Sequence, residues 1–278
     1  MKLLVLGAAG QLGGTFAACR DHEVVGLTRA DLDVTDREEV RRVADLHRPD
    51  AIINCTANND VDGAEDDPRP ALAVNAFAVG ALARGAADVG ATLVHFSTDF
   101  VFDGEADTPY TETDRARPVG VYGMSKLLGE WLAMDAPRAL VLRVESLFGG
   151  PQARSSVDRI VGALRGGRET PVFTDRVVSP SYVDDVVGAT LGLLATEAAS
   201  GVFHCVNSGH ASWADVGQFV AQALGAPTEL LRLTSVAGVG MRARRPVYCA
   251  LSNAKLEAAL GRTMPTWQDA LQRYLSRE

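Results

Sequence analysis

Residues 1–13, MKLLVLGAAGQLG, indicate how this chain folds. Leu3 to Leu6 is an uninterrupted apolar run, which is typical of a parallel strand buried on both faces. The turn that follows, with the spacing GxxGxxG, contains Gly7, Gly10, Gln11, Leu12 and Gly13. Glycines between a strand and a helix allow a tight turn, and they let a phosphate approach the backbone N–H groups of the helix. The stretch therefore predicts a dinucleotide-binding turn.

Strand and helix patterns alternate over the rest of the first half. We expect strands at 3–6, 23–27, 51–54, 92–96 and 139–144, and helices at 11–20, 70–89 and 122–134. A further helix is expected from Thr35 or Asp36, with Thr35 and Glu38 as a capping box. This alternation predicts an α/β fold with a doubly wound parallel sheet of the Rossmann type and right-handed crossovers.

The pattern loosens after Gly149-Gly150-Pro151. We expect helices at 156–164, 182–194 and 213–224, two more from 253 and 266, and a strand at 202–206. This part is predicted to form a smaller, irregular lobe that holds the substrate. The expected division is a dinucleotide-binding domain of residues 1–150 and 181–206 and a substrate-binding lobe of residues 151–180 and 207–278.

Composition excludes several classes of protein. The 278 residues are 47% hydrophobic and 22% charged, which is typical of a globular chain and not of a disordered one. A net charge of -8 disfavours nucleic acid and anionic membranes as partners. No uninterrupted apolar run approaches the roughly 18 residues of a membrane span, so we expect none. Whether the chain forms a homodimer is left open.

The cysteines and histidines carry no metal-binding or disulfide pattern. Cys19, Cys55, Cys205 and Cys249 are far apart and form no CxxC pair, and the five histidines show no HxxxH spacing. We therefore expect no metal site. Reduced thiols fit a cytoplasmic protein.

The end of the second strand bears on the choice of cofactor. An NAD site usually places an acid there to bind the ribose hydroxyls. Here the chain has Thr28 and Arg29, and the guanidinium can bind a 2′-phosphate through charge-assisted hydrogen bonds. We expect NADP, with NADPH preferred, and keep NAD as the alternative.

Three residues have the chemistry of a proton-transfer site. Tyr122 and Lys126 are four residues apart and so share one helix face. The lysine cation, together with a nearby oxidised nicotinamide, is expected to lower the tyrosine pKa toward neutrality, which suits a group that exchanges a proton with an alcohol. Thr98 follows the fourth strand, where its hydroxyl can bind a substrate oxygen beside Tyr122.

These features resemble those of the extended short-chain dehydrogenases/reductases, and in particular the dTDP-4-dehydrorhamnose reductase family. The similarity covers nearly the whole length. Its segments are GAAGQLG at 7–13, DVTD at 33–36, VDGAE at 61–65, VNAFAVGALA at 74–83, FSTDFVFDG at 96–104, PYTE at 109–112, YGMSKLLGE at 122–130 and RRP at 244–246.

The resemblance implies roles for several residues. It implies a catalytic triad of Thr98, Tyr122 and Lys126. It also implies that a further group of residues lies along the cofactor, namely Asp33, Val34, Cys55, Thr56, Ala57 and Asn75.

Three segments depart from the family where it would contact the sugar. Asn58 stands where the family usually has an aromatic residue, and Ser146 stands where its RTSW segment has tryptophan. The DQxGxPT segment is replaced by residues 175–181, which include Arg176. Arg242, Arg244 and Arg245 form a basic cluster that is either an ordinary surface loop or a clamp for a nucleotide diphosphate, with Arg245 as the candidate ligand.

We therefore expect an NAD(P)H-dependent reductase of a keto group on a nucleotide-linked deoxysugar. A 4,6-dehydratase is disfavoured, because Phe100 and not glutamate follows Thr98-Asp99. Two alternatives stay open. One is a sugar-nucleotide epimerase of the same fold, and the other is a non-catalytic NADP-binding regulatory subunit, since fold alone does not determine function.

Overall fold

A six-stranded parallel sheet forms the centre of the computed structural model, which describes residues 1–196 and 198–277. The strand order is β2-β1-β3-β4-β5-β10. The strands are β1 (Lys2–Leu6), β2 (Glu23–Leu27), β3 (Ala51–Asn54), β4 (Thr92–Thr98), β5 (Ala139–Val144) and β10 (Gly201–His204). The expected α/β class and parallel sheet are confirmed.

The apolar runs place side chains on both faces of this sheet. Leu3 and Val5 join one core, together with Phe16, whereas Leu4 and Leu6 join a second core on the opposite face. Successive residues of a strand point to opposite faces, so a strand covered on both sides must be apolar throughout.

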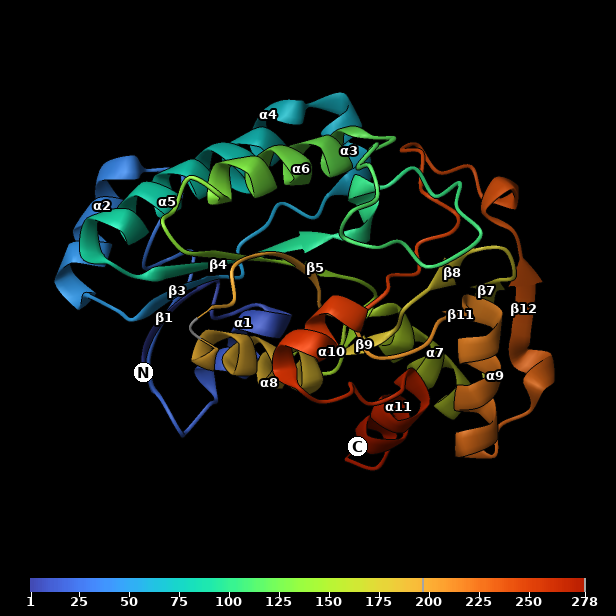
Figure 1. Ribbon diagram of the computed structural model, residues 1–278. Helices are drawn as coiled ribbons and strands as arrows, with labels where there is room; N and C mark the ends of the chain where they lie inside the picture. The colour runs from blue at the N-terminus through green and yellow to red at the C-terminus, as the bar shows by residue number, and fades with distance from the viewer. Residues whose placement is uncertain (197, 278) are drawn as a thin grey trace.

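Helices cover both faces (Figure 1). Helices α2 (Arg37–His47), α5 (Ala78–Val89) and α6 (Val121–Ala133) lie on one side, and α1 (Gln11–Ala17) and α8 (Val183–Ala195) lie on the other. The strand order reverses between β1 and β3, so the carboxyl ends of these strands flank a crevice, where open α/β sheets bind ligands.

One expected helix cap and one expected helix boundary were wrong. Helix α2 begins with Asp36 as its N-cap, which accepts from the N–H groups of Glu38 and Glu39, while the Thr35 hydroxyl donates to Asp33. The expected capping box is therefore absent. Helix α1 ends at Ala17 and not at Arg20.

The expected helix at 70–89 is longer and interrupted. It consists of α4 (Pro68–Leu72), a π-helical turn (Ala73–Phe77) and α5, and it is preceded by a short helix that we did not expect, α3 (Val61–Asp66). Pro68–Val89 is long and apolar enough to span a membrane by length and composition, although Arg69, Arg84 and Asp88 interrupt its apolar residues. This is weak support for a span, because 56% of its 18-residue window is buried inside the protein.

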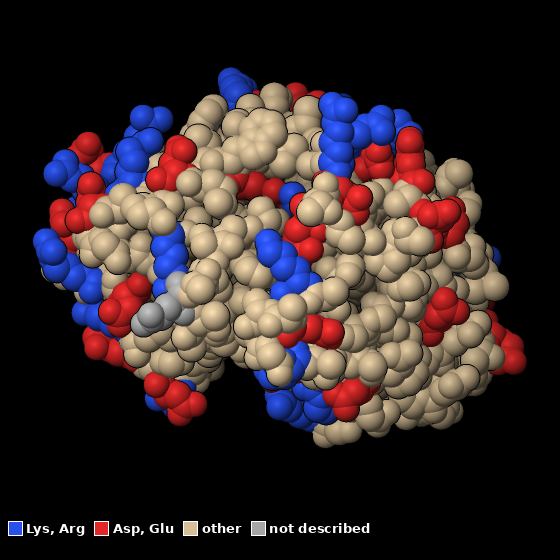
Figure 2. All heavy atoms as spheres, in the orientation of Figure 1, with Lys and Arg blue, Asp and Glu red and all other residues tan. Residues whose placement is uncertain are grey.

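The remaining elements form a smaller lobe beside the carboxyl ends of the strands. Its short pairings are β6 (Leu147–Phe148) with β9 (Ser181–Tyr182), β7 (Thr170–Phe173) with β12 (Leu231–Thr234), and β8 (Val177–Val178) with β11 (Ala211–Ser212). Its helices are α7 (Ser156–Arg165), α9 (Trp213–Leu224), α10 (Ala254–Leu260) and α11 (Trp267–Leu275). Short 3-10 turns lie at Asp99–Val101, Thr228–Leu230 and Val236–Gly238. Acidic and basic side chains are interspersed over the visible face (Figure 2).

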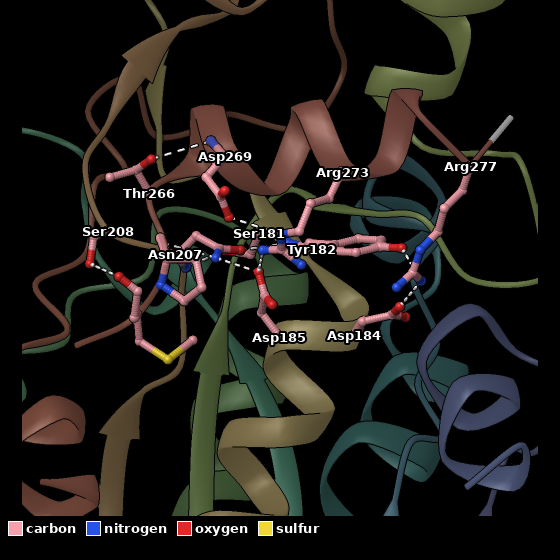
Figure 3. A network of polar contacts seen from close by, with 12 residues as sticks. Ser181, Tyr182, Asp184, Asp185, Asn207, Ser208, Thr266, Asp269, Arg273 and Arg277 are labelled. Atoms are coloured by element: carbon pink, nitrogen blue, oxygen red, sulfur yellow. Dashed lines mark hydrogen bonds and ion pairs between the residues drawn. The ribbon is translucent and has the colours of Figure 1, made fainter. Parts of the chain in front are cut away.

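A polar network fastens α11 to the start of α8 (Figure 3). Arg273 of α11 binds Asp185 at 2.6 Å and Asp269 at 2.8 Å. Arg277 pairs with Asp184, and Asn207 donates to Asp185 at 2.7 Å. This network therefore holds the last helix of the second lobe against the start of α8.

Candidate active site

A cleft of about 1020 Å³ lies at the carboxyl ends of β1, β3, β4 and β5. Most of the residues singled out from the sequence line it. They are Gly7, Gly10, Gln11, Leu12, Thr28, Arg29, Asp33, Val34, Cys55, Thr56, Ala57, Asn58, Thr98, Tyr122, Lys126, Ser146 and Arg176. The described lining does not include Gly13, Asn75 or Arg245.

The glycine turn closes one end of this cleft. Gly7 has a φ of 80°, in the left-handed region that favours glycine, and its N–H donates to Leu27 O at 2.9 Å. Gly10 is the N-cap of α1. A Cβ on Gly13 would lie 2.2 Å from Gly7 O, so Gly13 lets α1 pack on the turn and is not itself part of the wall. Backbone N–H groups are thus open to a phosphate at the start of α1.

The loop after β2 carries the exposed cation of Arg29 beside two carboxylates that accept hydrogen bonds from threonine hydroxyls. The Thr28 hydroxyl donates to Asp31 at 2.7 Å, and the Thr35 hydroxyl donates to Asp33 at 2.7 Å. Hydrogen bonds from Thr35 hold the pKa of Asp33 below its usual value, and nearby Arg29 lowers it further. Arg29 is exposed at the edge of the cleft, where its guanidinium can bind an anion.

The three proton-transfer candidates come together from two elements. Thr98 ends β4, and Tyr122 and Lys126 lie on the first two turns of α6; all three are buried. The Tyr122 hydroxyl donates to Asn59 Oδ1 at 3.3 Å. Lys126 Nζ donates to Phe96 O at 2.5 Å, which holds the ammonium beside the end of β4.

In the protein by itself, the pKa of Tyr122 is shifted in the direction opposite to the one expected beside Lys126 and an oxidised nicotinamide. Burial raises the pKa of Tyr122, the charge of Asp99 raises it further, and an interaction with the Thr98 hydroxyl lowers it only in part. Burial lowers the pKa of Lys126 to about 8. Tyr122 is therefore a protonated phenol at neutral pH, the state required of a proton donor.

Asn75 supports the wall of the cleft from behind. It is fully buried in the π-helical turn, where its amide oxygen accepts from the Asn58 N–H at 2.8 Å. Its amide nitrogen donates to Asn58 O at 3.0 Å and to Ser125 Oγ at 3.0 Å. Asn75 thus holds the loop after β3 against α6.

The structure does not bring Arg245 to the cleft. Its guanidinium forms a two-pronged ion pair with Asp62 of α3, at 2.9 and 3.2 Å. Arg242 pairs with Asp66 in the same region, and Arg244 lies 4.0 Å from Glu105. The basic cluster therefore attaches its loop to neighbouring segments. Arg245 does not lie in the cleft, where a clamp for a nucleotide diphosphate would need it.

Sequence reasoning missed a buried polar cluster on the cleft floor. Asp99, Glu145 and Cys249 each offer a ligand-type atom, and these atoms lie within 4.8 Å of one another. Burial raises the pKa of Asp99 and of Glu145, and Arg176 opposes both shifts. Only the adjacency of Asp99 to Thr98 signalled this group, because Glu145 and Cys249 lie on distant segments.

The substrate-facing departures also lie at the cleft. Asn58 lines it, and Ser146 has a φ of 46°, which is unusual for a residue other than glycine. Trp213, at the start of α9, contributes an aromatic side chain that the sequence analysis did not assign to the site.

Comparisons with known proteins agree with this geometry. The family model described as RmlD substrate binding domain matches residues 1–278. A dTDP-4-dehydrorhamnose reductase of Mycolicibacterium smegmatis is 36% identical over 276 residues, covering 98% of this chain and 84% of that protein. A probable dTDP-4,6-dihydroxy-2-methyloxan-3-one 4-ketoreductase of Streptomyces antibioticus is 34% identical and covers 98% of this chain and 94% of its own length.

A solved structure shows the same arrangement of elements. The dTDP-4-dehydrorhamnose reductase of Bacillus anthracis, in complex with NADP, has a TM-score of 0.94 and 27% identity, covering 100% of this chain and 99% of that one. With the family model matched over its whole length, this chain belongs to the RmlD substrate binding domain family.

Proposed function

We propose that this protein is an NADPH-dependent reductase of a keto group on a nucleotide-linked sugar. The observation that carries the proposal is that Thr98, Tyr122 and Lys126 line the same cleft as the glycine turn after β1. A proton donor therefore shares one space with a site for a dinucleotide phosphate. The relatives of Mycolicibacterium smegmatis and Streptomyces antibioticus are named as reductases of such sugars, which supports this reading.

The cleft fits NADP. The positive φ at Gly7 and the close packing at Gly13 expose N–H groups for a pyrophosphate, and Arg29 is free to bind a 2′-phosphate. The Bacillus anthracis structure is described in complex with NADP. When bound, the reduced cofactor supplies the hydride.

We propose the following roles for the chain's own residues. Tyr122 gives its phenolic proton to the carbonyl oxygen as the hydride arrives at the carbon, so the ketone gains one hydride and one proton. Thr98 orients that oxygen. Lys126, whose ammonium lies beside the end of β4, would hold the nicotinamide ribose and tune Tyr122. Asn75 acts as a positioning residue through the loop that contains Cys55, Thr56, Ala57 and Asn58.

The sugar ring itself is proposed to differ from dehydrorhamnose. Asn58 and Ser146 stand where the resembled family has large aromatics, and losing one aromatic contact costs about 0.5–1.5 kcal/mol beyond the buried area. New polar groups reject a substrate that leaves them unpaired by a larger factor. We therefore expect poor turnover of dTDP-4-dehydrorhamnose and better turnover of another keto sugar, with Asn58, Ser146 and Arg176 facing it.

The test is a panel of keto-sugar nucleotides assayed by NADPH oxidation, with Tyr122→Phe beside the wild type. We expect kcat for Tyr122→Phe to fall by about 10²–10⁴-fold with little change in NADPH affinity. Near-normal kcat in this variant would refute the proton-donor assignment. Efficient reduction of dTDP-4-dehydrorhamnose, with kcat/KM above about 10⁵ M⁻¹s⁻¹, would refute the substrate proposal alone.

The two open alternatives predict other results. An epimerase would retain NAD through purification and would not oxidise added NADPH in net terms. A regulatory subunit would bind NADP without turning over any sugar. We further propose a cytoplasmic location, in line with four free cysteines. We also propose that residues 1–150 and 181–206 form the dinucleotide-binding domain and that residues 151–180 and 207–278 form the substrate-binding lobe. A homodimer stays open.

A further inference from the structure

The buried cluster behind Thr98 and Tyr122 has no assigned role. Asp99 and Glu145 are 4% and 2% exposed, although both carry an ionisable carboxyl group. Glu145 Oε2 accepts from the Ser179 N–H at 2.7 Å, and Asp99 Oδ1 accepts from the Thr98 hydroxyl at 2.9 Å. The other oxygens, Asp99 Oδ2 and Glu145 Oε1, are buried and have no hydrogen-bond partner among the described residues.

Charge counting indicates that this cluster holds a proton. One carboxyl oxygen of Asp99 and one of Glu145 lie within 4.8 Å of each other, and two ionised carboxylates at such a distance repel each other strongly where both are buried. One cation, the half-buried Arg176, compensates one negative charge. The charged or titratable groups that act on the pair are Arg176, Cys249, Tyr122 and Tyr248. Since the thiol and the phenols are neutral, a proton on the pair balances the site.

A metal ion fits the side chains of Asp99, Glu145 and Cys249 less well than a proton does. Coordination would require both carboxylates and the Cys249 thiol to be ionised, and burial raises the pKa of all three. The guanidinium of Arg176 already supplies a positive charge there.

The pair is connected to the proposed proton donor. The Thr98 hydroxyl donates to Asp99 Oδ1 at 2.9 Å and also interacts with the Tyr122 phenol, whose own proton is directed at Asn59 Oδ1 at 3.3 Å. Once Tyr122 has lost that proton, the Thr98 hydroxyl can donate to the phenolate while it accepts from Asp99. After Tyr122 has given its proton away, it must be reprotonated before the next turnover, and its side chain in the wall of the cleft is only 9% exposed.

We propose that Asp99 and Glu145 share one proton in the resting protein and that this pair reprotonates Tyr122 through the Thr98 hydroxyl. This rests on the proposed reductase function. Asp99 releases its proton to Thr98 Oγ1 while the Thr98 hydroxyl proton passes to the Tyr122 phenolate. The pair is then doubly ionised beside Arg176, and it regains one proton from solvent before the next turnover. Glu145 acts through Asp99 and is therefore a positioning residue.

The first experiment uses the protein without substrate. The infrared spectrum at neutral pH should contain the C=O band of a protonated carboxylic acid, which shifts in D₂O. Glu145→Gln and Asp99→Asn should each abolish the band, because the remaining carboxylate then faces Arg176 alone. The control Glu257→Gln alters a glutamate that accepts from Ser208 and Met264 in the other lobe, and it should leave the band unchanged.

Three results would overturn the proposal that Asp99 and Glu145 share a proton. One is the absence of the band from the wild type. Another is its survival in Asp99→Asn, which would mean that Glu145 is protonated by itself. A stoichiometric divalent metal in the purified protein would also overturn it.

The second experiment tests the proton supply with any keto sugar that the wild type reduces. Glu145→Gln keeps an acceptor for Ser179 and should lower kcat by up to about 10²-fold while KM and the NADPH Kd stay nearly constant. An unchanged kcat would refute the supply role. Failure of the reductase function would instead appear as a wild type without turnover, and the infrared result does not depend on it.

Discussion

Burial determines the charge of single residues along the cleft. The phenol of Tyr122 and the carboxyl of Glu145 lose contact with water, so the pKa of each is raised and the neutral form is favoured. Lys126 is affected in the opposite direction, because its charged form is the protonated one. By contrast, Arg29 is exposed at the edge of the cleft.

Substituting Arg29 by alanine should weaken NADPH more than NADH. The reason is that only NADPH carries the 2′-phosphate, and a charge-assisted contact to it contributes about 1.5–3 kcal/mol. Fluorescence titration of both cofactors measures this difference. An equal loss for both would mean that Arg29 is an ordinary surface residue.

The affinity for NADPH should fall as the pH rises through about 8. Burial places the pKa of Lys126 at about 8, so its positive charge is present below this pH and lost above it. Bound anionic cofactor favours the charged form, so linkage weakens binding by at most about tenfold per pH unit above that point. The Kd, titrated across neutral and alkaline pH, should lose this dependence in Lys126→Met and retain it in Arg29→Ala.

At the scale of elements, helix α1 meets the end of β1 through backbone contact at Gly7 and Gly13. No side chain separates the two segments there, since a Cβ on Gly13 would lie 2.2 Å from Gly7 O and 2.8 Å from Gly7 C. The close approach sets how the N–H groups at the start of α1 face the cleft.

Gly13→Ala should therefore destabilise the protein and weaken NADPH. Backbone atoms cannot move aside cheaply, and overpacking of this kind costs about 1–3 kcal/mol. The matched control is Gly188→Ala in α8, where no atom lies within 4 Å of the added Cβ and stability should rise by about 0.5–1 kcal/mol. Urea unfolding compares the two, and equal midpoints would contradict the close-approach argument.

At the scale of the molecule, one network joins the last helix to the start of α8 (Figure 3). Asp185 at the start of α8 is 12% exposed at its side chain and is held by Arg273 of α11 and by Asn207. Removing Arg273 would leave the carboxylate of Asp185 with fewer hydrogen-bond donors at a site that water reaches poorly.

Arg273→Ala should lower the free energy of unfolding by about 1–3 kcal/mol. The control Arg232→Ala breaks an ion pair with Glu169 whose side chains are 70% and 56% exposed, and it should cost less than about 1 kcal/mol. Both values come from urea denaturation. A control as damaging as Arg273→Ala would show that the buried setting of Asp185 is irrelevant.

The sequence by itself determined the elements whose signals are local. The bounds of β2, β3, β5 and α9 agree with those expected, because apolar runs and helical periodicity record burial residue by residue. The meeting of Thr98, Tyr122 and Lys126 followed from the same logic, since strand ends and helix faces in a doubly wound sheet converge on one edge.

Only the tertiary structure decided the contacts between distant segments. The two- to four-residue strands of the second lobe are too short to show a period, and they form because their partners pair with them. Arg245 binds Asp62, 183 positions away, and the carboxyl pair of Asp99 and Glu145 exists because two strand ends are adjacent. Desolvation and Coulomb energy depend on distances in space, so the pKa of Tyr122 and the protonation of that pair could not be read from the order of the residues.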